Sequence, residues 1–411
     1  MIDRIKPELL APVGDMERLE SALNYGADAV YLAGKTFGMR AAPSNFSDEE
    51  LAEAVRRCHE KGVRVHVTCN TIPHNDELNG LPQFMEHCQN IGVDAFIIAD
   101  IGVMEMAKKY APNVDIHVST QAGVINYQTA NAFYNMGAKR VVLAREATLA
   151  EIKEIREKTP KDLEIEAFVH GAMCMSFSGR CLLSSYLTGR DANRGDCAQP
   201  CRWEYTLMEG KREGQYFDIQ EEKGKTFIMN SRDMNMIDHI SEIIDCGITS
   251  LKIEGRAKSA YYVACITNAY RKAIDFNYDH PGEKMPEWIS REAEKISHRE
   301  YSTGFYMGTE PGQKTDTGSY IREYEVVAIC EGYDEENKLA KLSQRNRFFK
   351  GQVADVLEPQ SDVYEIKLDE MFDADMNPID VAPHPTWTVY VRTEHPIKKG
   401  AYLRVLKENR N

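Results

Sequence analysis

The chain contains 411 residues, of which 43% are hydrophobic and 28% are charged, so its composition is that of a soluble globular protein with two or three domains. Its formal net charge of −14 argues against a protein whose whole surface binds nucleic acid, because phosphate contacts need lysine and arginine. The charge does not exclude a local basic patch, for example the one formed by Lys341, Arg345, Arg347 and Lys350.

The first residues, MIDRIKPELLAPVG, mix acidic and basic side chains and show no apolar segment before a small-residue cleavage site. We therefore expect no signal peptide. No stretch approaches the roughly 18 uninterrupted apolar residues that predict a membrane span, so we expect a cytoplasmic protein. Because cytosolic thiols stay reduced, clustered cysteines indicate a metal or catalytic site rather than disulfides.

Between residues 9 and 254 one pattern recurs, in which a helix-like segment ends in glycine and a short apolar run follows. Glycine suits the left-handed backbone that often follows a helix. The runs are continuous rather than alternating, which is typical of strands buried on both faces of a parallel sheet. Eight strands are predicted in this way, at Leu9–Val13, Ala29–Ala33, Arg64–Thr68, Ala95–Asp100, Asp115–Thr120, Arg140–Ala144, Glu164–His170 and Ser250–Glu254.

A helical pattern follows each predicted strand, and the last one covers Ala257–Phe276. The sequence therefore predicts an α/β fold in which eight βα units form a (β/α)8 TIM-like barrel over residues 1–280. An open doubly wound sheet is the alternative. One further short strand candidate, Thr226–Met229, lies in the long excursion between the seventh and eighth units.

The composition changes after residue 280. Residues 281–320 contain a polar, proline-containing stretch and Gly/Thr turns, and they are predicted to be a linker region. Residues 321–411 consist of short β-type runs separated by turn signals such as EGYDEEN and KKG. Their spacing predicts a small antiparallel C-terminal β domain, either a barrel or a sandwich.

The ten cysteines fall into two groups. Six are isolated on predicted helices and strands, where a cysteine is usually a small core residue, and we call these core cysteines: Cys58, Cys69, Cys88, Cys246, Cys265 and Cys330. Four cluster in a glycine-rich insertion around residues 171–232, and we call these loop cysteines: Cys174, Cys181, Cys197 and Cys201. Their spacing, C-x6-C-x15-C-x3-C, favours an iron–sulfur cluster over zinc, although zinc stays open on spacing alone.

Longer motifs in and around the insertion resemble peptidase family U32. The resemblance covers nearly the whole chain, and its last two motifs are similar to the C-terminal domain of that family. The motifs are EAFVHGAMC at 166–174, SGRCLLS at 178–184, RGDCAQPCR at 194–202, NSRD at 230–233, KIEGR at 252–256, NRFFKG at 346–351 and VAPHP at 381–385.

The family name implies a collagenase-like peptidase, whereas other members resemble oxygen-independent hydroxylases with a 4Fe-4S cluster. The RGDCAQPCRW block and the C-terminal domain are most similar to the branch that hydroxylates the wobble uridine of tRNA to 5-hydroxyuridine and depends on prephenate. Related branches act on ribosomal RNA cytidine or on the quinone ring. The resemblance thus implies tRNA and prephenate as partners. Where two paralogues pair, it also implies a hetero-oligomer, in which this chain is either the catalytic subunit or a non-catalytic scaffold.

The resemblance also implies a ligand set. The loop cysteines would hold the cluster, but relatives place a ligand just after the SRD block, where this chain has Asn235. The fourth ligand is therefore either Cys201 or an open iron site. A peptidase would need its own machinery, and the sequence contains neither an HExxH nor a GxSxG motif.

Polar residues at the ends of the predicted strands complete the expected site, because chemistry in such barrels sits at the carboxyl ends of the strands. Arg145, Lys252 and Arg256 would bind a dicarboxylate such as prephenate, since an arginine fork matches a carboxylate. His170 would transfer protons, and Glu254 would act as a base or orient Arg256. For each of these residues a structural ion pair at a strand end is the alternative.

Overall fold

The computed structural model describes residues 4–35, 45–174, 176–177, 181–192, 196–203, 207–208, 216–217, 231–308 and 320–407. The strand candidate Thr226–Met229 lies outside these residues. Within them, no helix combines the length and the apolar character that crossing a bilayer requires.

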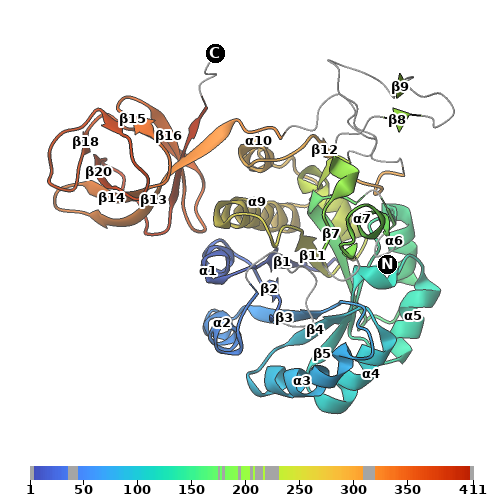
Figure 1. The fold of residues 1–411 in the computed structure, drawn as a ribbon. Helices are drawn as coiled ribbons and strands as arrows, with labels where there is room; N and C mark the ends of the chain where they lie inside the picture. The colour runs from blue at the N-terminus through green and yellow to red at the C-terminus, as the bar shows by residue number, and fades with distance from the viewer. Residues whose placement is uncertain are drawn as a thin grey trace.

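Eight parallel strands of the described residues close into a barrel (Figure 1). Each strand pairs with the next along the chain, and the last strand pairs with both the first and the seventh. The barrel strands are β1 (Glu8–Pro12), β2 (Ala29–Leu32), β3 (Arg64–Cys69), β4 (Ala95–Ile98), β5 (Asp115–Val118), β6 (Arg140–Val142), β7 (Glu164–Ala172) and β11 (Ser250–Ile253). The predicted (β/α)8 barrel is thereby confirmed, and the open sheet is excluded by the β11–β7 pairing.

Helices cover the outside of the barrel. They are α1 (Met16–Asn24), α2 (Asp48–Glu60), α3 (Leu81–Asn90), α4 (Ile101–Tyr110), α5 (Tyr127–Asn135), α6 (Leu149–Glu157), α8 (Ile240–Asp245) and α9 (Ala260–Asp279). Capping boxes at Ser47 and Thr148 satisfy the free amides at the starts of α2 and α6. The recurring glycines after the helices have positive φ angles, as the pattern predicted, at Gly26, Gly62, Gly92, Gly137 and Gly247.

Several elements extend the barrel at its carboxyl end. Strand β10 (Asp233–Asn235) runs antiparallel to the end of β7 and parallel to β12 (Tyr301–Ser302). The cysteine-rich insertion contributes α7 (Leu183–Thr188) and the short pair β8 (Leu207–Met208) and β9 (Tyr216–Phe217).

Residues 281–308 fall within the segment that we predicted to be a linker. They include α10 (Glu287–Glu292) and β12, and they add apolar side chains to the barrel core. The apolar side chains buried there are Ile289, Ala293, Ile296 and Tyr306. The segment is therefore packed on the barrel rather than extended between the two domains.

The C-terminal domain is all β, as predicted, and it has its own hydrophobic core. Its main antiparallel sheet has the order β17-β16-β21-β13-β14-β20-β18, and β15 pairs with β19 beside it. The strands are β13 (Tyr324–Asp334), β14 (Leu339–Gln344), β15 (Phe348–Phe349), β16 (Val353–Leu357), β17 (Tyr364–Lys367), β18 (Met371–Phe372), β19 (Val381–Ala382), β20 (Thr388–Arg392) and β21 (Tyr402–Leu406).

A buried ion pair joins the two domains. Nη2 of Arg404 on β21 lies 2.7 and 2.6 Å from the two carboxylate oxygens of Glu292 on α10, and both side chains are almost fully buried. The hydroxyl of Tyr25, the residue that follows α1, donates to the carbonyl of Leu357 at 2.9 Å. These contacts fix the C-terminal domain against α10 and the end of α1.

Candidate active site at the barrel mouth

Arg145 and Glu254 meet at the carboxyl ends of β6, β7 and β11. Arg145 donates to the Ala172 carbonyl at 2.7 Å, and its Nη2 lies 3.6 Å from Oε2 of Glu254. Its guanidinium also lies 3.9 Å from the ring centroid of Phe168. The structure therefore brings together two of the predicted site residues, and aromatic and backbone contacts hold the arginine in place.

Arg256 occupies a second position at the mouth and is buried. It donates to Oγ1 of Thr68 at 3.1 Å and to Oδ1 of Asn45 at 3.2 Å. Its carbonyl oxygen packs against Gly14, where a Cβ atom would stand only 2.4 Å away. Arg256 is thus held by groups from three parts of the chain, which fixes its guanidinium before any ligand arrives.

The ends of β7 and β11 approach each other so closely that a glycine is required between them. Gly171 has a φ of +110°, and a Cβ atom there would lie 2.7 Å from the Glu254 carbonyl oxygen. Next to it, the Glu254 amide donates to the His170 carbonyl at 2.9 Å. This contact sets the height of Glu254 relative to the strand that leads into the loop cysteines.

His170 is enclosed rather than open to the mouth, which corrects the proton-transfer role expected for it. Burial lowers its pKa to about 3, so the imidazole stays uncharged near neutral pH. The rings of Tyr262, Tyr270 and Tyr301 lie around it, and the Tyr270 hydroxyl is 3.4 Å from Nδ1. Asn235 is its register partner on β10. His170 therefore packs the end of β7 against α9 and β12.

Lys252 also lies in the interior, which corrects its expected place among the groups that would bind a dicarboxylate. Its ammonium is 2.7 Å from Oε1 of Glu166, and both side chains are buried. A lysine inside the β11 strand points into the barrel, and the buried carboxylate holds it there. It is therefore engaged before any ligand reaches the mouth.

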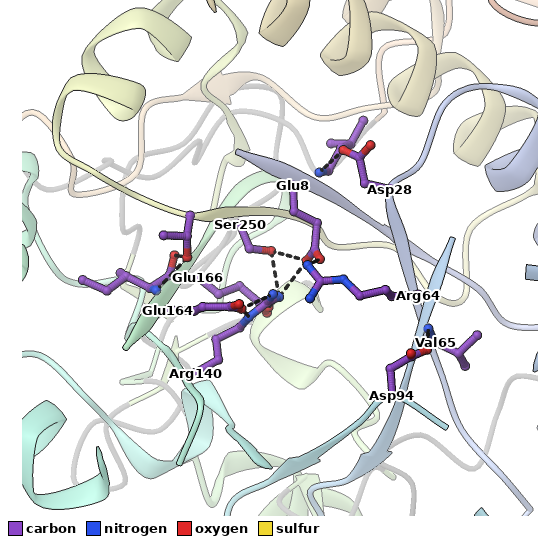
Figure 2. Close-up of polar contacts among 12 residues, drawn as sticks. Glu8, Asp28, Arg64, Val65, Asp94, Arg140, Glu164, Glu166 and Ser250 are labelled. Carbon is purple, nitrogen blue, oxygen red and sulfur yellow. Dashed lines mark hydrogen bonds and ion pairs between the residues drawn. The ribbon is translucent and has the colours of Figure 1, made fainter. Parts of the chain in front are cut away.

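Sequence reasoning missed an ionic network inside the barrel, part of which Figure 2 shows. Arg140 lies 2.7 Å from Glu8 and 2.8 Å from Glu166, and Ser250 donates to Glu8 at 2.8 Å. Burial opposes ionisation of Glu8, but Arg140, His66 and Arg64 together outweigh it and lower the pKa of Glu8 to about 2. The signal in the sequence was a charged residue within an otherwise apolar strand.

Two imidazoles lie beside this network. One atom each of His66, His117 and Glu166 lies within 4.8 Å of the other two, and all three residues are buried. This geometry resembles a metal site, but Glu166 is already paired with both Lys252 and Arg140. Two adjacent positive charges oppose a bound cation, and burial keeps both imidazoles neutral. We interpret the group as part of the polar interior of the barrel.

The loop cysteines follow directly from the mouth. Cys174 lies just beyond the end of β7, Cys181 precedes α7, and Cys201 lies in the 3-10 helix η4 (Pro200–Arg202). The Ala198 amide donates to Oγ of Ser184 at 3.0 Å, which ties this segment to α7. The Gln199 amide donates to Sγ of Cys197 at 3.3 Å, a contact of the kind that tunes iron–sulfur ligands.

The two groups of cysteines differ in their surroundings. All six core cysteines are buried, as predicted, and burial raises the pKa of Cys58, Cys69 and Cys265 to about 12. Cys174 and Cys197 are exposed, and the other two loop cysteines are partly so. Four accessible thiols beside a barrel mouth form a donor set that is suited to a metal centre. The core thiols are buried and stay protonated, so they do not form such a set.

A closed (β/α)8 barrel with a cysteine-rich insertion at its mouth and a C-terminal β domain defines the class of this protein. Residues 14–316 match the model of "Peptidase family U32", and residues 322–404 match that of "Peptidase family U32 C-terminal domain". The chain belongs to peptidase family U32, as the motifs predicted.

Its relatives carry different names. It is 38% identical to the tRNA hydroxylation protein P1 of Bacillus subtilis (strain 168), over 97% of this chain and 94% of the relative. It is 33% identical to the tRNA hydroxylation protein P of Escherichia coli (strain K12), over 94% of this chain and 93% of the relative. It is also 34% identical to a collagenase of Porphyromonas gingivalis (strain ATCC BAA-308 / W83), over 75% of each chain.

Proposed function

We propose that this chain hydroxylates tRNA without oxygen gas and converts the wobble uridine to 5-hydroxyuridine. A 4Fe-4S cluster on the loop cysteines and prephenate as the oxygen donor are part of this proposal. The observation that carries it is the position of the loop cysteines, which follow the strand end that also supports Arg145 and Glu254. The relatives named for tRNA hydroxylation, aligned over nearly the full chain, support tRNA as the substrate.

The loop cysteines would hold the cluster through their thiolates, and Cys201 is the fourth ligand in this proposal. A cluster held there supplies electron transfer at the mouth, which a hydroxylation without oxygen gas requires. Asn235 is engaged elsewhere, because its Oδ1 accepts from the Tyr270 hydroxyl at 3.1 Å and from the Ile237 amide at 3.2 Å. It caps the turn after β10 and leaves ligation to the insertion.

Arg145 and Arg256 would bind the carboxylates of prephenate. Both guanidiniums are held by several contacts before binding, so little side-chain entropy is lost when a carboxylate arrives. Glu254 lies 3.6 Å from Arg145 and keeps its positive charge oriented toward the end of β11. Neutral His170 packs beneath them and supports the strand end from which the cysteine insertion departs.

The cluster is tested by anaerobic purification of the full chain with iron, sulfide and zinc quantitation and an optical spectrum. We expect about four irons and four sulfides per chain, which is the composition of the cluster. Serine substitution of Cys174, Cys181, Cys197 or Cys201 should each remove them, whereas Cys246→Ala, at a core cysteine, should not. Zinc in place of iron would refute the redox proposal. Retention of the cluster in Cys201→Ser would show that three cysteine thiolates hold it and that one iron has no cysteine ligand.

The reaction is tested by nucleoside mass spectrometry of tRNA from cells that lack the gene and carry each variant. We expect 5-hydroxyuridine with the wild type and none with the loop cysteine variants. Arg145→Gln should raise the KM for prephenate at least about tenfold, because a charge-assisted hydrogen bond contributes roughly 1.5–3 kcal/mol. An unchanged KM would show that this arginine does not bind the donor.

The collagenase relative favours one second candidate, a peptidase. The test is digestion of collagen by the purified chain. If the wild type and the four loop cysteine variants digest collagen with equal activity, this result would support hydrolysis in place of hydroxylation. Hydroxylation that requires a co-purified paralogue would instead make this chain one subunit of a pair.

A further inference from the structure

A line of exposed or partly exposed basic side chains runs from the barrel mouth onto the C-terminal domain. We call it the basic strip, and it consists of Lys258, Arg322, Lys407 and Arg347. Within the part of the chain that the structure describes, none of these four forms an ion pair with a carboxylate. Neighbouring cations without a carboxylate partner among the described residues are unexpected in a chain whose net charge is −14.

The strip begins next to the candidate active site. Lys258 follows β11 by a few residues, and its amide donates to the Gly255 carbonyl at 2.8 Å. Its ammonium lies 5.1 Å from the ring centroid of Tyr320, and the guanidiniums of Arg299 and Arg322 lie 5.2 and 5.8 Å from the same ring. The negative faces of an aromatic ring attract cations, so Tyr320 gathers three positive charges at the edge of the mouth.

The strip continues across the junction of the two domains. The Lys407 amide donates to the Glu323 carbonyl at 2.7 Å, which places the end of β21 beside the residue that follows Arg322. Lys407 and Arg347 line the same hollow, which has a volume of about 480 Å³ and also includes Phe349, the exposed Leu406 and one carboxylate, Glu325. Across this junction the strip therefore reaches an amphipathic hollow on the C-terminal domain.

Several other basic side chains of the C-terminal domain form ion pairs with acidic neighbours. The pairs include Lys338–Glu394, Lys341–Glu331, Lys350–Asp380, Lys367–Asp369 and Arg392–Glu370. The patch that the sequence indicated is therefore divided, since Lys341 and Lys350 are paired, whereas Arg345 and Arg347 form no ion pair within the described residues.

We propose that the basic strip binds the phosphate backbone of RNA and guides the strand from the C-terminal domain to the barrel mouth. The choice of RNA as the polyanion rests on the proposed function. Phosphates match a row of unpaired lysine and arginine side chains, and an apolar surface beside them suits an unstacked base. Phe349 and Leu406 supply that surface in the hollow.

The test measures binding of unmodified tRNA to the purified full chain as a function of salt. The variant is the triple substitution Arg322→Gln/Arg347→Gln/Lys407→Gln, and the matched control is Lys338→Gln/Lys341→Gln/Lys367→Gln. Both remove three charges, but the control removes only paired ones. Each lost contact to a single strand reduces the slope of log K against log salt by about 0.7, so the strip variant should lose about 2 units and the control almost none.

Equal slopes for the strip variant and the control would overturn the proposal, and so would a wild type that binds no tRNA. Weakened binding to polyglutamate with unchanged binding to tRNA would overturn it too, because the strip would then bind an acidic protein. Nucleoside analysis separates this result from the proposed function. If the strip variant still hydroxylates tRNA and binds it normally, the role of the basic strip is refuted and the proposed reaction is not. If the strip variant loses salt dependence of tRNA binding but the wild type forms no hydroxylated nucleoside, the proposed reaction is refuted and the role of the strip is not.

Discussion

Three buried histidines should make this protein sensitive to mild acid. Burial lowers the pKa of His66 to about 4 and that of His170 to about 3, and it holds the pKa of His117 well below its usual value. The unfolded chain takes up these protons near pH 6.5. Between pH 6.5 and pH 4 the unfolded state therefore binds more protons than the folded state, and stability falls as the pH falls.

The size of this effect follows from the shifts. Each pKa unit corresponds to about 1.4 kcal/mol, so His66 accounts for about 3 kcal/mol and His170 for about 5 kcal/mol by the time the pH has fallen through their folded pKa values. In the middle of the window three histidines together give a slope of roughly 4 kcal/mol per pH unit. Glu8 adds to the loss below pH 4.5, because its lowered pKa stabilises the fold only while the carboxylate is charged.

The assay is urea unfolding followed by circular dichroism at pH 7.5, 6.5 and 5.5. The wild-type midpoint should change little above pH 6.5 and fall steeply below it, with a constant m value. His66→Gln should remove about one third of the slope, and His74→Gln, at an exposed position, should remove none. A wild-type midpoint that is the same at all three pH values would refute the reasoning, and so would a His66→Gln slope equal to that of the wild type.

Three further predictions concern packing and reactivity. Arg404→Met should cost about 3 kcal/mol and increase proteolysis between the domains, because it leaves the buried Glu292 without its main partner; a loss below about 1 kcal/mol in urea unfolding would contradict this. Gly171→Ala should destabilise the fold by about 2 kcal/mol more than Gly62→Ala, whose added Cβ meets nothing within 4 Å, and equal midpoints would contradict the close contact with Glu254. Iodoacetamide should modify the metal-free folded chain at Cys174 and Cys197 long before it modifies any core cysteine, and mass spectrometry measures the order of modification. Early modification of a core cysteine would contradict the burial of these residues.

The barrel could be predicted from the sequence because its signals are local. Each strand is a short apolar run, and five of the helices are followed by a glycine with positive φ, so these boundaries are encoded within a few residues. The C-terminal domain was predictable for the same reason, since turn residues separate its strands. The loop cysteines were visible because four thiols in a glycine-rich segment have no role in a core.

Contacts between distant parts of the chain could not be predicted in this way. Arg404 and Glu292 are 112 residues apart, and nothing near either residue indicates the other. The same holds for the network in which Arg140 joins Glu8 and Glu166 across the barrel interior. The local sequence shows only a charge in an apolar run, and the partner appears when the sheet closes.

The position of a residue within its strand decides whether it belongs to the interior or to the mouth. Side chains at every second position of a strand point to the same side, so Ser250, Lys252 and Glu254 follow one another along the inner face of β11 and beyond its end. Ser250 joins the Glu8 network, Lys252 pairs with Glu166, and Glu254 reaches Arg145 at the mouth. Lys252 lies within the strand, where a buried carboxylate neutralises it, whereas Glu254 follows the last strand residue. For a barrel of this kind, a charged residue is therefore a candidate for chemistry when it lies on the inner face and beyond the end of its strand.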